Sequence, residues 1–357
     1  MSAKRENLRI GFSTGAAATA AAKAAAIGWR DGAIPDAVTI RLPKGQELRV
    51  PIAESRIRNG EATAVVVKDA GDDPDVTHGA RVGATIRPTA SPGLLIAGGA
   101  GVGRLTKPGL VLPPGEFAIN PTPRAMLRES LAPFHEGAAE GLKATVFIEK
   151  GEILAQKTLN PRLGIVGGLS VLGTTGLVRP FSNSAYIATI ASALKVARAL
   201  SLEEAVLATG GRSEGFARAA RPDLPEEAFV QIADFFSGGL KLAAKSGFKT
   251  IGLAVFFGKA AKQALGFPYT HAHQSELALA PLFSALPGVP PRLLEALAGA
   301  PTALAALNIL KDGGLLSLVV PIADRVLASA RGFVGPGPRL WARIFDFDGK
   351  SLAFREA

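Results

Sequence analysis

The stretch VVVKDAGDDPDVTHGA, residues 65–80, joins a strand pattern to a dense group of acidic residues. Its three leading valines are β-branched, which favours a buried strand that ends at the following turn. Four aspartates within seven residues repel one another unless solvent, backbone N–H groups, a cation or a substrate takes up their charge. Asp, Gly and Pro also favour ordinary solvated turns. The position at the end of a buried strand, beside a histidine, nevertheless makes this loop the leading candidate for a functional site.

The composition around this loop is that of a large α/β protein. The chain has 357 residues, enough for two domains and a large core. Aromatic residues make up only 6% of it, so the core is expected to consist mostly of Ala, Leu, Val and Ile. The absence of cysteine excludes disulfides, thiolate metal sites and a cysteine nucleophile. Because no secretion signal and no long uncharged apolar run are present, we expect a soluble cytoplasmic protein with no membrane contact.

The net charge of +10 indicates either an anionic partner or a surface that favours solubility. The basic residues are scattered and never form a run interleaved with aromatic residues, which argues against nucleic acid. A small polyanionic ligand is therefore the expected partner. A homo-oligomer remains open.

Residues 1–165 have the pattern of a strand-rich α+β domain that contains the acidic loop. The alanine-rich segment 11–29 predicts a helix, with Ser13 and Thr14 as candidates for its capping residue. Free N–H groups at such a start can hold an anion, although ordinary capping explains the same residues. β-Hairpins are predicted for 38–42 with 46–52, for 145–148 with 153–157, and, at the end of the chain, for 340–345 with 352–354.

The segment 98–103, GGAGVG, is a glycine-rich loop after a short strand. It superficially resembles a dinucleotide-binding fingerprint. A Lys-Pro-Gly turn follows, however, where that fingerprint requires a helix. We therefore interpret the segment as a backbone-lined loop and not as a nucleotide motif.

Residues 166–357 change to a pattern of strand, glycine turn and helix that occurs three times. This alternation predicts a Rossmann-like parallel sheet with helices on its faces, so the fold class of the whole chain is α/β. The strands are expected at 205–208, 229–233 and 250–256. Ligands of such sheets bind beyond the carboxyl ends of the strands. The turns expected on that rim are 209–212, 234–239 and 258–259.

Seven segments resemble, in order, the motif series of the cobalt-precorrin-5B C(1)-methyltransferases, the CbiD family. The combination covers most of the chain and is far more specific than any single piece. The segments are GFSTGAAATAAAKAAA (11–26), KDAGDDPDVTHGA (68–80), GVGRLTKPGL (101–110), PPGEFAINPTPRAML (113–127), GIVGGLSVLGTTGLVRP (164–180), TGGRSE (209–214) and FGKAAKQALGFPYTHAH (257–273).

This resemblance implies an S-adenosylmethionine-dependent methyltransferase that methylates C-1 of cobalt-precorrin-5B, giving cobalt-precorrin-6A, in anaerobic cobalamin biosynthesis. A tetrapyrrole with many acetate and propionate arms suits a protein of charge +10. Methyl transfer from a sulfonium is an in-line displacement, in which catalysis is mainly positioning in a dry pocket.

The methyl donor is expected on the carboxyl-end rim of residues 166–357, with Gly210 and Gly211 at its carboxylate and Asp234 at its ribose. Alternatively, these glycines only make turns and the donor lies against the N-terminal motifs. The candidate substrate-binding residues are Thr14, Lys107, Arg124, Thr174, Thr175 and Arg179. The three basic residues among them are candidates for pairing with ring carboxylates, and each is equally compatible with an ordinary surface charge.

Two roles are open for the acidic loop. Its aspartates either accept backbone N–H groups and hold the loop together, which suits Asp73 or Asp75 best, or one of them stabilises a cation or accepts a proton. The candidate catalytic residues are Asp72, Asp73, Asp75 and His78, with Thr270 and His271 as partners from the second half of the chain.

No metal ligand set is expected. An isolated His-x-His pair such as His271 and His273 is more often structural than metal-binding. Two competing classes remain: a corrinoid-binding protein without catalytic activity, and a nicotinamide-dependent dehydrogenase that uses the glycine loops. The first needs no site for the methyl donor, so titration with S-adenosylhomocysteine separates it from the enzyme. The second leaves the acidic loop unexplained.

Overall fold

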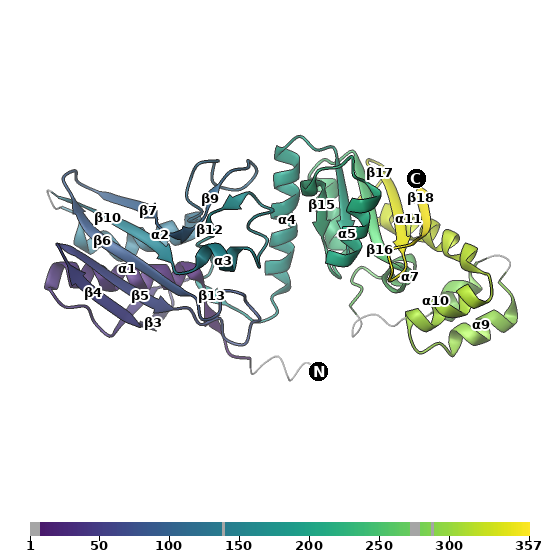
Figure 1. The fold of residues 1–357 in the computed structure, drawn as a ribbon, viewed down its shortest axis with the longest axis horizontal. Coiled ribbons are helices and arrows are strands. Elements are labelled where there is room, and N and C mark those ends of the chain that lie inside the picture. Colours follow the sequence, from purple (N-terminus) through teal and green to yellow (C-terminus); the bar gives the residue numbers. More distant parts are fainter. Residues whose placement is uncertain (1–7, 138–139, 272–278, 287–288) are drawn as a thin grey trace. The chain divides into compact units, whose positions relative to one another are not determined.

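The computed structural model describes residues 8–137, 140–271, 279–286 and 289–357. The chain forms two compact units, Met1–Ser182 and Asn183–Ala357 (Figure 1). The division therefore falls after Ser182 and not after residue 165, where the sequence suggested it. The reason is that β12 (Gly168–Leu169) and β13 (Leu177–Val178) pair with strands of the first unit.

A five-stranded sheet, in the order β4-β5-β6-β10-β7, forms the centre of the first unit. Neighbouring strands are antiparallel except for β10 and β7, which are parallel. The acidic loop connects β5 to β6, as its position after the valine run predicted. The bounds are β4 (Glu54–Arg58), β5 (Glu61–Val67), β6 (Arg81–Thr89), β10 (Gly141–Ile148) and β7 (Leu94–Gly98).

Helix α1 (Thr14–Asp31) packs across β5 and β6 (Figure 1). The Ser13 side chain caps its start by accepting a hydrogen bond from the Ala16 N–H group. Nine of its alanines are fully buried, and these small side chains allow the helix axis to come close to the sheet. Helix α2 (Pro121–Leu131) packs beside α1 and completes the core of this unit.

Short strand pairs surround this core. They are β1 (Gly11–Phe12) with β13, β8 (Gly101–Val102) with β12, β9 (Arg104–Leu105) with β11 (Ile165–Val166), and the predicted hairpin of β2 (Ala37–Arg41) with β3 (Glu47–Pro51). A short 3-10 helix, η1 (Ala132–Phe134), follows α2.

The hairpin predicted for 145–148 with 153–157 is wrong. Both edges of β10 already pair with other strands, β6 on one side and β7 on the other, so no further strand can join it. The chain instead enters the short helix α3 (Gly151–Ala155). The Glu152 carboxylate fixes this helix by accepting the Gly101 N–H group at 2.8 Å.

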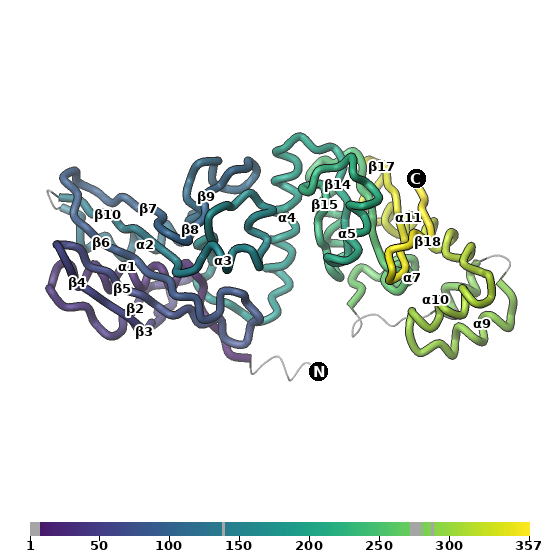
Figure 2. The backbone as a smooth tube through the Cα atoms, viewed as in Figure 1, coloured from purple at the N-terminus to yellow at the C-terminus, as the bar shows by residue number. Residues whose placement is uncertain are grey.

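The second unit contains a sheet in the order β15-β14-β16-β17-β18 (Figure 2). The first four strands are parallel and β18 is antiparallel to β17, which confirms the Rossmann-like prediction and the last hairpin. The chain leaves β14 to one side to form β15 and then returns to its other side to form β16. The sheet therefore has a switch point between β14 and β16. The bounds are β14 (Glu204–Ala208), β15 (Phe229–Gln231), β16 (Thr250–Phe256), β17 (Arg339–Phe345) and β18 (Ser351–Glu356).

Helices cover both faces of this sheet, and two apolar clusters lie between them and the strands. None of the described helices combines the length and the apolarity that a membrane span requires. The helices are α4 (Asn183–Ala199), α5 (Gly211–Ala220), η2 (Glu226–Ala228), α6 (Phe236–Lys245), α7 (Phe257–Ala264), α8 (Leu279–Ser284), α9 (Pro291–Ala298), α10 (Ala303–Asp312), η3 (Leu316–Leu318) and α11 (Val319–Val334).

Candidate functional site

The acidic loop between β5 and β6 is held closed at its base and stapled to two distant segments. The Lys68 N–H group donates to the Ala80 carbonyl at 2.8 Å, which closes the base. Asp72 Oδ2 accepts the Arg9 N–H group at 2.7 Å, and Asp73 Oδ1 accepts the Phe181 N–H group at 2.9 Å. The predicted catalytic carboxylates of Asp72 and Asp73 therefore have backbone partners, as expected for residues that hold a loop together.

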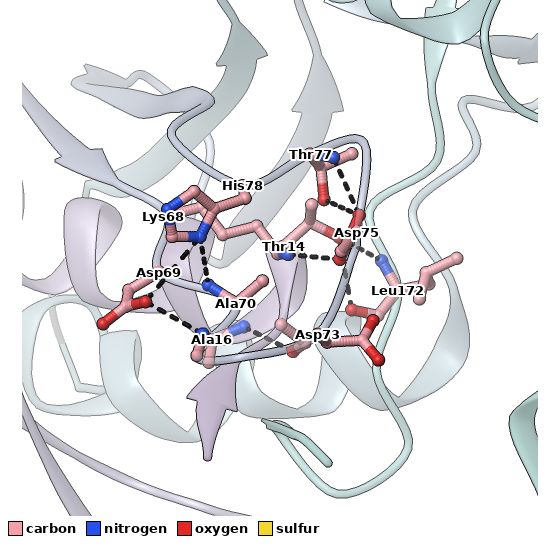
Figure 3. A network of polar contacts seen from close by, with 12 residues as sticks. Thr14, Ala16, Lys68, Asp69, Ala70, Asp73, Asp75, Thr77, His78 and Leu172 are labelled. Carbon is pink, nitrogen blue, oxygen red and sulfur yellow. Dashed lines mark hydrogen bonds and ion pairs between the residues drawn. The ribbon is translucent and has the colours of Figure 1, made fainter. Parts of the chain in front are cut away.

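The His78 side chain is half-exposed and lies beside Asp69 and Ala70 of the same loop (Figure 3). Its Nδ1 atom accepts the Ala70 N–H group at 3.1 Å. In a ring whose Nδ1 accepts this hydrogen bond, Nε2 carries the proton. The Asp69 carboxylate lies 3.8 Å from Nδ1. The pKa of Asp69 lies below its ordinary value because Arg9 hydrogen-bonds to it and the Gly71 N–H group adds a second donor.

Lys68 and Asp75 form a buried ion pair at 2.5 Å (Figure 3). The Lys68 side chain is 1% exposed and that of Asp75 is 25% exposed. The second oxygen of Asp75 accepts both the N–H and the hydroxyl of Thr77, each at 2.7 Å. Burial raises the pKa of Asp75, but Lys68 and Thr77 together outweigh burial, so the pKa lies below its ordinary value. Lys68 was not among the residues predicted from the sequence. Its position indicates an ion pair, because it directly follows a buried valine run and precedes four carboxylates.

A cavity of about 180 Å³ opens beside this ion pair. Asn160 lines it, is 8% exposed, and has a side-chain amide nitrogen without a hydrogen-bond partner. Leu172 also lines it and is 48% exposed, so the cavity reaches the surface of the unit. Asn160 was not among the residues predicted from the sequence, and no local pattern distinguishes it. The lining residues are Ser13, Thr14, Lys68, Asp75, Thr77, Thr158, Asn160, Leu169, Ser170, Leu172 and Val178.

Thr14 is the one predicted substrate-binding residue that lines this cavity. Its hydroxyl oxygen accepts the Leu172 N–H group at 3.0 Å, and the Gly15 N–H group donates to the Leu172 carbonyl at 2.9 Å. The sequence suggested free N–H groups at the start of this helix, but the Gly15 N–H group is occupied. The start of α1 is joined at this point to the segment that leads into β13.

The other predicted substrate-binding residues do not gather around the cavity. Arg124 donates from Nε to the Ile119 carbonyl at 2.8 Å, and Lys107 donates to the Arg162 carbonyl at 3.2 Å, so both basic groups already have partners. Thr175 forms a local turn through its hydroxyl. Thr174 and Arg179 are exposed, and no ion pair among the described residues involves Arg179.

In the second unit, Lys259 connects the loops that follow the strands on either side of the switch point. Its ammonium lies 3.0 Å from Asp234 Oδ1 and donates to the carbonyls of Thr209 at 3.4 Å and Ala233 at 3.3 Å. Asp234 Oδ1 also accepts the Thr270 hydroxyl at 3.2 Å. The predicted rim residues are thus brought together at the carboxyl ends of β14, β15 and β16, with Lys259 as their common partner.

Gly210 and Gly211 lie at the start of α5, where a Cβ on Gly210 would meet no atom within 4 Å. The Cβ side of Gly210 is therefore open, whereas a Cβ on Gly211 would contact Gln231 Nε2 at 3.7 Å. Thr270 contacts Asp234, and the His271 ring stacks on Tyr269 at 6.0 Å between centroids, so the contacts described for both residues lie within the second unit. His273, the other half of the His-x-His pair, lies outside the described residues. Across the described part of the chain, no group of three or more His, Asp or Glu is placed to hold a metal ion.

These features define an α/β protein with a cavity lined by polar and apolar side chains in an α+β unit, and with Asp234, Lys259 and Thr270 gathered at the carboxyl ends of the strands of a Rossmann-like unit. Residues 1–180 match the CbiD family model, and residues 269–356 match the model described as "CbiD, C-terminal domain". A relative from Salinispora arenicola, named cobalt-precorrin-5B C(1)-methyltransferase, is 44% identical over 96% of this chain and 91% of its own. A relative of the same name from Nitratidesulfovibrio vulgaris is 44% identical over 98% of this chain and 93% of its own. The chain belongs to the CbiD family, which confirms the resemblance seen in the sequence.

A solved structure with a related title is also similar to this chain. The crystal structure of the cobalamin biosynthesis protein (cbiD) from Archaeoglobus fulgidus shares 22% identity, with 86% of this chain and 85% of that chain covered and a TM-score of 0.39. This score is too low to carry an argument about geometry.

Proposed function

We propose that the protein is an S-adenosylmethionine-dependent methyltransferase that methylates C-1 of cobalt-precorrin-5B in cobalamin biosynthesis. The observation that carries this proposal is the similarity to relatives of that name along nearly the whole of both chains. Similarity confined to one unit would give weaker support for this activity, because a fold by itself does not define an activity. Here both units are matched.

The carboxyl-end rim of the second unit supports the site for the methyl donor. Ligands of open parallel sheets bind at the switch point, which here lies between β14 and β16. The open backbone at Gly210 suits a carboxylate at the start of α5. Asp234 uses Oδ1 for its two described contacts, and no described hydrogen bond uses Oδ2, so this oxygen can accept the ribose hydroxyls. The residues present therefore fit S-adenosylmethionine.

The reaction itself makes few demands on protein side chains. The C-1 carbon forms a bond to the methyl carbon while the carbon–sulfur bond breaks, and the sulfur keeps the electron pair as S-adenosylhomocysteine leaves. The protein has to bring C-1, the methyl carbon and the sulfur into line and exclude water. His78 is a poor candidate for a base because its only unprotonated nitrogen, Nδ1, already accepts the Ala70 N–H group. We assign the acidic loop mainly to holding and orienting the site.

The test is incubation of the purified protein with methyl-labelled S-adenosylmethionine and cobalt-precorrin-5B, followed by mass spectrometry of the tetrapyrrole. We expect the tetrapyrrole to gain one labelled methyl group at C-1. Calorimetric titration with S-adenosylhomocysteine is the companion experiment. Binding of the tetrapyrrole without any binding of S-adenosylhomocysteine would show a corrinoid-binding protein instead of an enzyme.

The donor site has its own test in Asp234→Asn, which keeps the shape of the side chain and removes its charge. A hydrogen bond to a charged group is worth about 1.5–3 kcal/mol, so we expect affinity for S-adenosylhomocysteine to fall at least roughly tenfold. Asp312→Asn, on an exposed residue at the end of α10, is the matched control. Unchanged affinity in a stably folded Asp234→Asn would direct the search for the donor to the N-terminal motifs.

A further inference from the structure

Two buried side chains on the wall of the cavity in the first unit, Asn160 and Lys68, have N–H groups for which the structure describes no partner. The Asn160 amide nitrogen has two N–H groups and no partner. The Lys68 ammonium has three N–H groups and makes one described hydrogen bond, to Asp75. Asp75, the one carboxylate among the described residues that line the cavity, already accepts three hydrogen bonds. The ligand that completes this set must therefore supply acceptor oxygens.

The start of α1 adds a further attraction for negative charge. Ser13 and Thr14 lie on the cavity wall, and the helix that begins there is 18 residues long. The N–H groups of Gly15 and Ala16 already have protein partners, so the helix start contributes only the partial positive charge of its dipole. The charges of Lys68 and Asp75 balance each other, so the helix start and the unpartnered Asn160 amide decide the preference of the cavity for an anion.

The size of the cavity limits what can enter. Its volume is about 180 Å³, whereas pockets for whole drug-sized ligands measure about 300–1,000 Å³. A tetrapyrrole or S-adenosylmethionine is therefore too large to enter whole. A single carboxymethyl group fits, with space left for a few waters of about 30 Å³ each.

We propose that this cavity binds a carboxylate, and that in the reaction the carboxylate is an acetate arm of the tetrapyrrole. Asn160 and Lys68 donate to its oxygens, and the start of α1 stabilises its charge. Only the identity of the arm rests on the proposed function. The carboxylate preference rests on the hydrogen-bond donors and the helix start at the cavity, and does not depend on the proposed function. Anchoring one arm in this cavity fixes the rotation of the ring and so selects which ring carbon is presented for methylation.

The first experiment titrates the full chain with ¹³C-labelled acetate and follows the carboxyl resonance by NMR. We expect saturable binding on the order of millimolar, as suits a ligand of four heavy atoms. Acetamide, which has the same shape without the charge, should bind at least roughly tenfold more weakly. Absence of saturable acetate binding, or equal binding of acetate and acetamide, would overturn the proposal.

Two variants locate the site. Asn160→Asp places a negative charge where the donors lie and should abolish acetate binding. Asn160→Leu has a similar volume and no donor and should weaken binding at least roughly tenfold. Asn308→Asp, on an exposed position of α10, is the matched control and should bind acetate like the wild type. If Asn160→Leu folds and binds acetate normally, the site lies elsewhere.

Competition identifies the source of the carboxylate. Cobalt-precorrin-5B should displace labelled acetate, and S-adenosylhomocysteine should not. Displacement by S-adenosylhomocysteine alone would assign the cavity to the methyl donor and overturn the acetate-arm assignment. Because acetate binding requires no turnover, a protein that binds acetate but transfers no methyl group contradicts only the proposed function. A protein that methylates without binding acetate contradicts only this inference.

Discussion

At the scale of single residues, the Lys68–Asp75 pair determines whether the acidic loop can stay folded. An ammonium that is 1% exposed is stable only with a charged partner, because removing one member of a buried pair leaves an uncompensated charge. Asp73 differs, since its described contact is a single hydrogen bond from a backbone N–H group. The two aspartates stand two positions apart and should therefore respond very differently to the same substitution.

We predict that Asp75→Asn lowers the free energy of unfolding by about 3 kcal/mol, because it leaves the Lys68 charge unpaired. Asp73→Asn should lower it by about 1 kcal/mol or less. Urea denaturation of both variants checks the order. A catalytic aspartate would show the opposite behaviour, with lost methyl transfer at unchanged stability. Equal and small losses of stability in both variants would mean that the ion pair is not structural.

Two aspartates of the loop, Asp69 and Asp75, predict the response of the protein to acid. The pKa values of Asp69 and Asp75 are lowered in the folded state, so the unfolded state binds more protons as pH falls. Their stabilisation is complete above the unfolded value of about 3.9 and is lost as pH falls through the lower folded values. The melting temperature should therefore fall when the pH is lowered below about 4. Asp75→Asn should show a shallower drop, and a slope identical to that of the wild type would contradict the assignment.

At the scale of elements, glycines let the backbone of the first unit pack without space for side chains. A Cβ on Gly101 would lie 1.9 Å from the Ile148 carbonyl oxygen, and one on Gly151 would lie 2.2 Å from the Gly101 carbonyl oxygen. These contacts join β8, the end of β10 and the start of α3. The glycine-rich stretch 98–103 thus has a packing role that explains its composition without a nucleotide.

We predict that Gly101→Ala destabilises the protein by at least about 2 kcal/mol more than Gly60→Ala. Both glycines have positive φ values, 71° and 75°, so both variants carry a similar backbone strain of about 1 kcal/mol. Only Gly101 adds a collision with a carbonyl oxygen, because Gly60 has no atom within 4 Å of the added carbon. Thermal or urea unfolding measures the difference. Equal losses would mean that the backbone around Gly101 moves apart freely.

The elements that the sequence predicted well are those that local chemistry determines. The cap at Ser13, the alanine run and the three strand-glycine-helix units all produced the expected structure. The strand expected at 153–157 failed because the decisive fact, that β6 and β7 already occupy both edges of β10, depends on distant residues. No window of a few residues contains that information.

The candidate site also has one part that local sequence predicts and one part that depends on distant segments. The turn-forming and stapling character of the acidic loop was readable from its aspartates, and the rim at Asp234 followed from strand order. The cavity was not readable, because segments near residues 13, 68, 160 and 170 build it together. Asn160 looks like an ordinary polar residue between Leu159 and Pro161 until those segments meet around it.

At the scale of the whole molecule, the net charge of +10 predicts how binding depends on salt. A tetrapyrrole with several ionised arms is attracted over the Debye length, which falls from about 30 Å at 0.01 M salt to about 8 Å at 0.15 M. Exposed charge pairs contribute about 0.2–1 kcal/mol each, so the loss of several such pairs should lower the affinity roughly tenfold over this range of salt.

Arg179 is exposed and is a predicted partner of a ring carboxylate. Arg179→Gln should therefore make tetrapyrrole affinity less dependent on salt. S-adenosylhomocysteine has no net charge at neutral pH and should bind with nearly constant affinity, which makes it the control. Tetrapyrrole binding that does not change with salt would assign the positive charge to solubility and leave the cavity as the main source of carboxylate recognition.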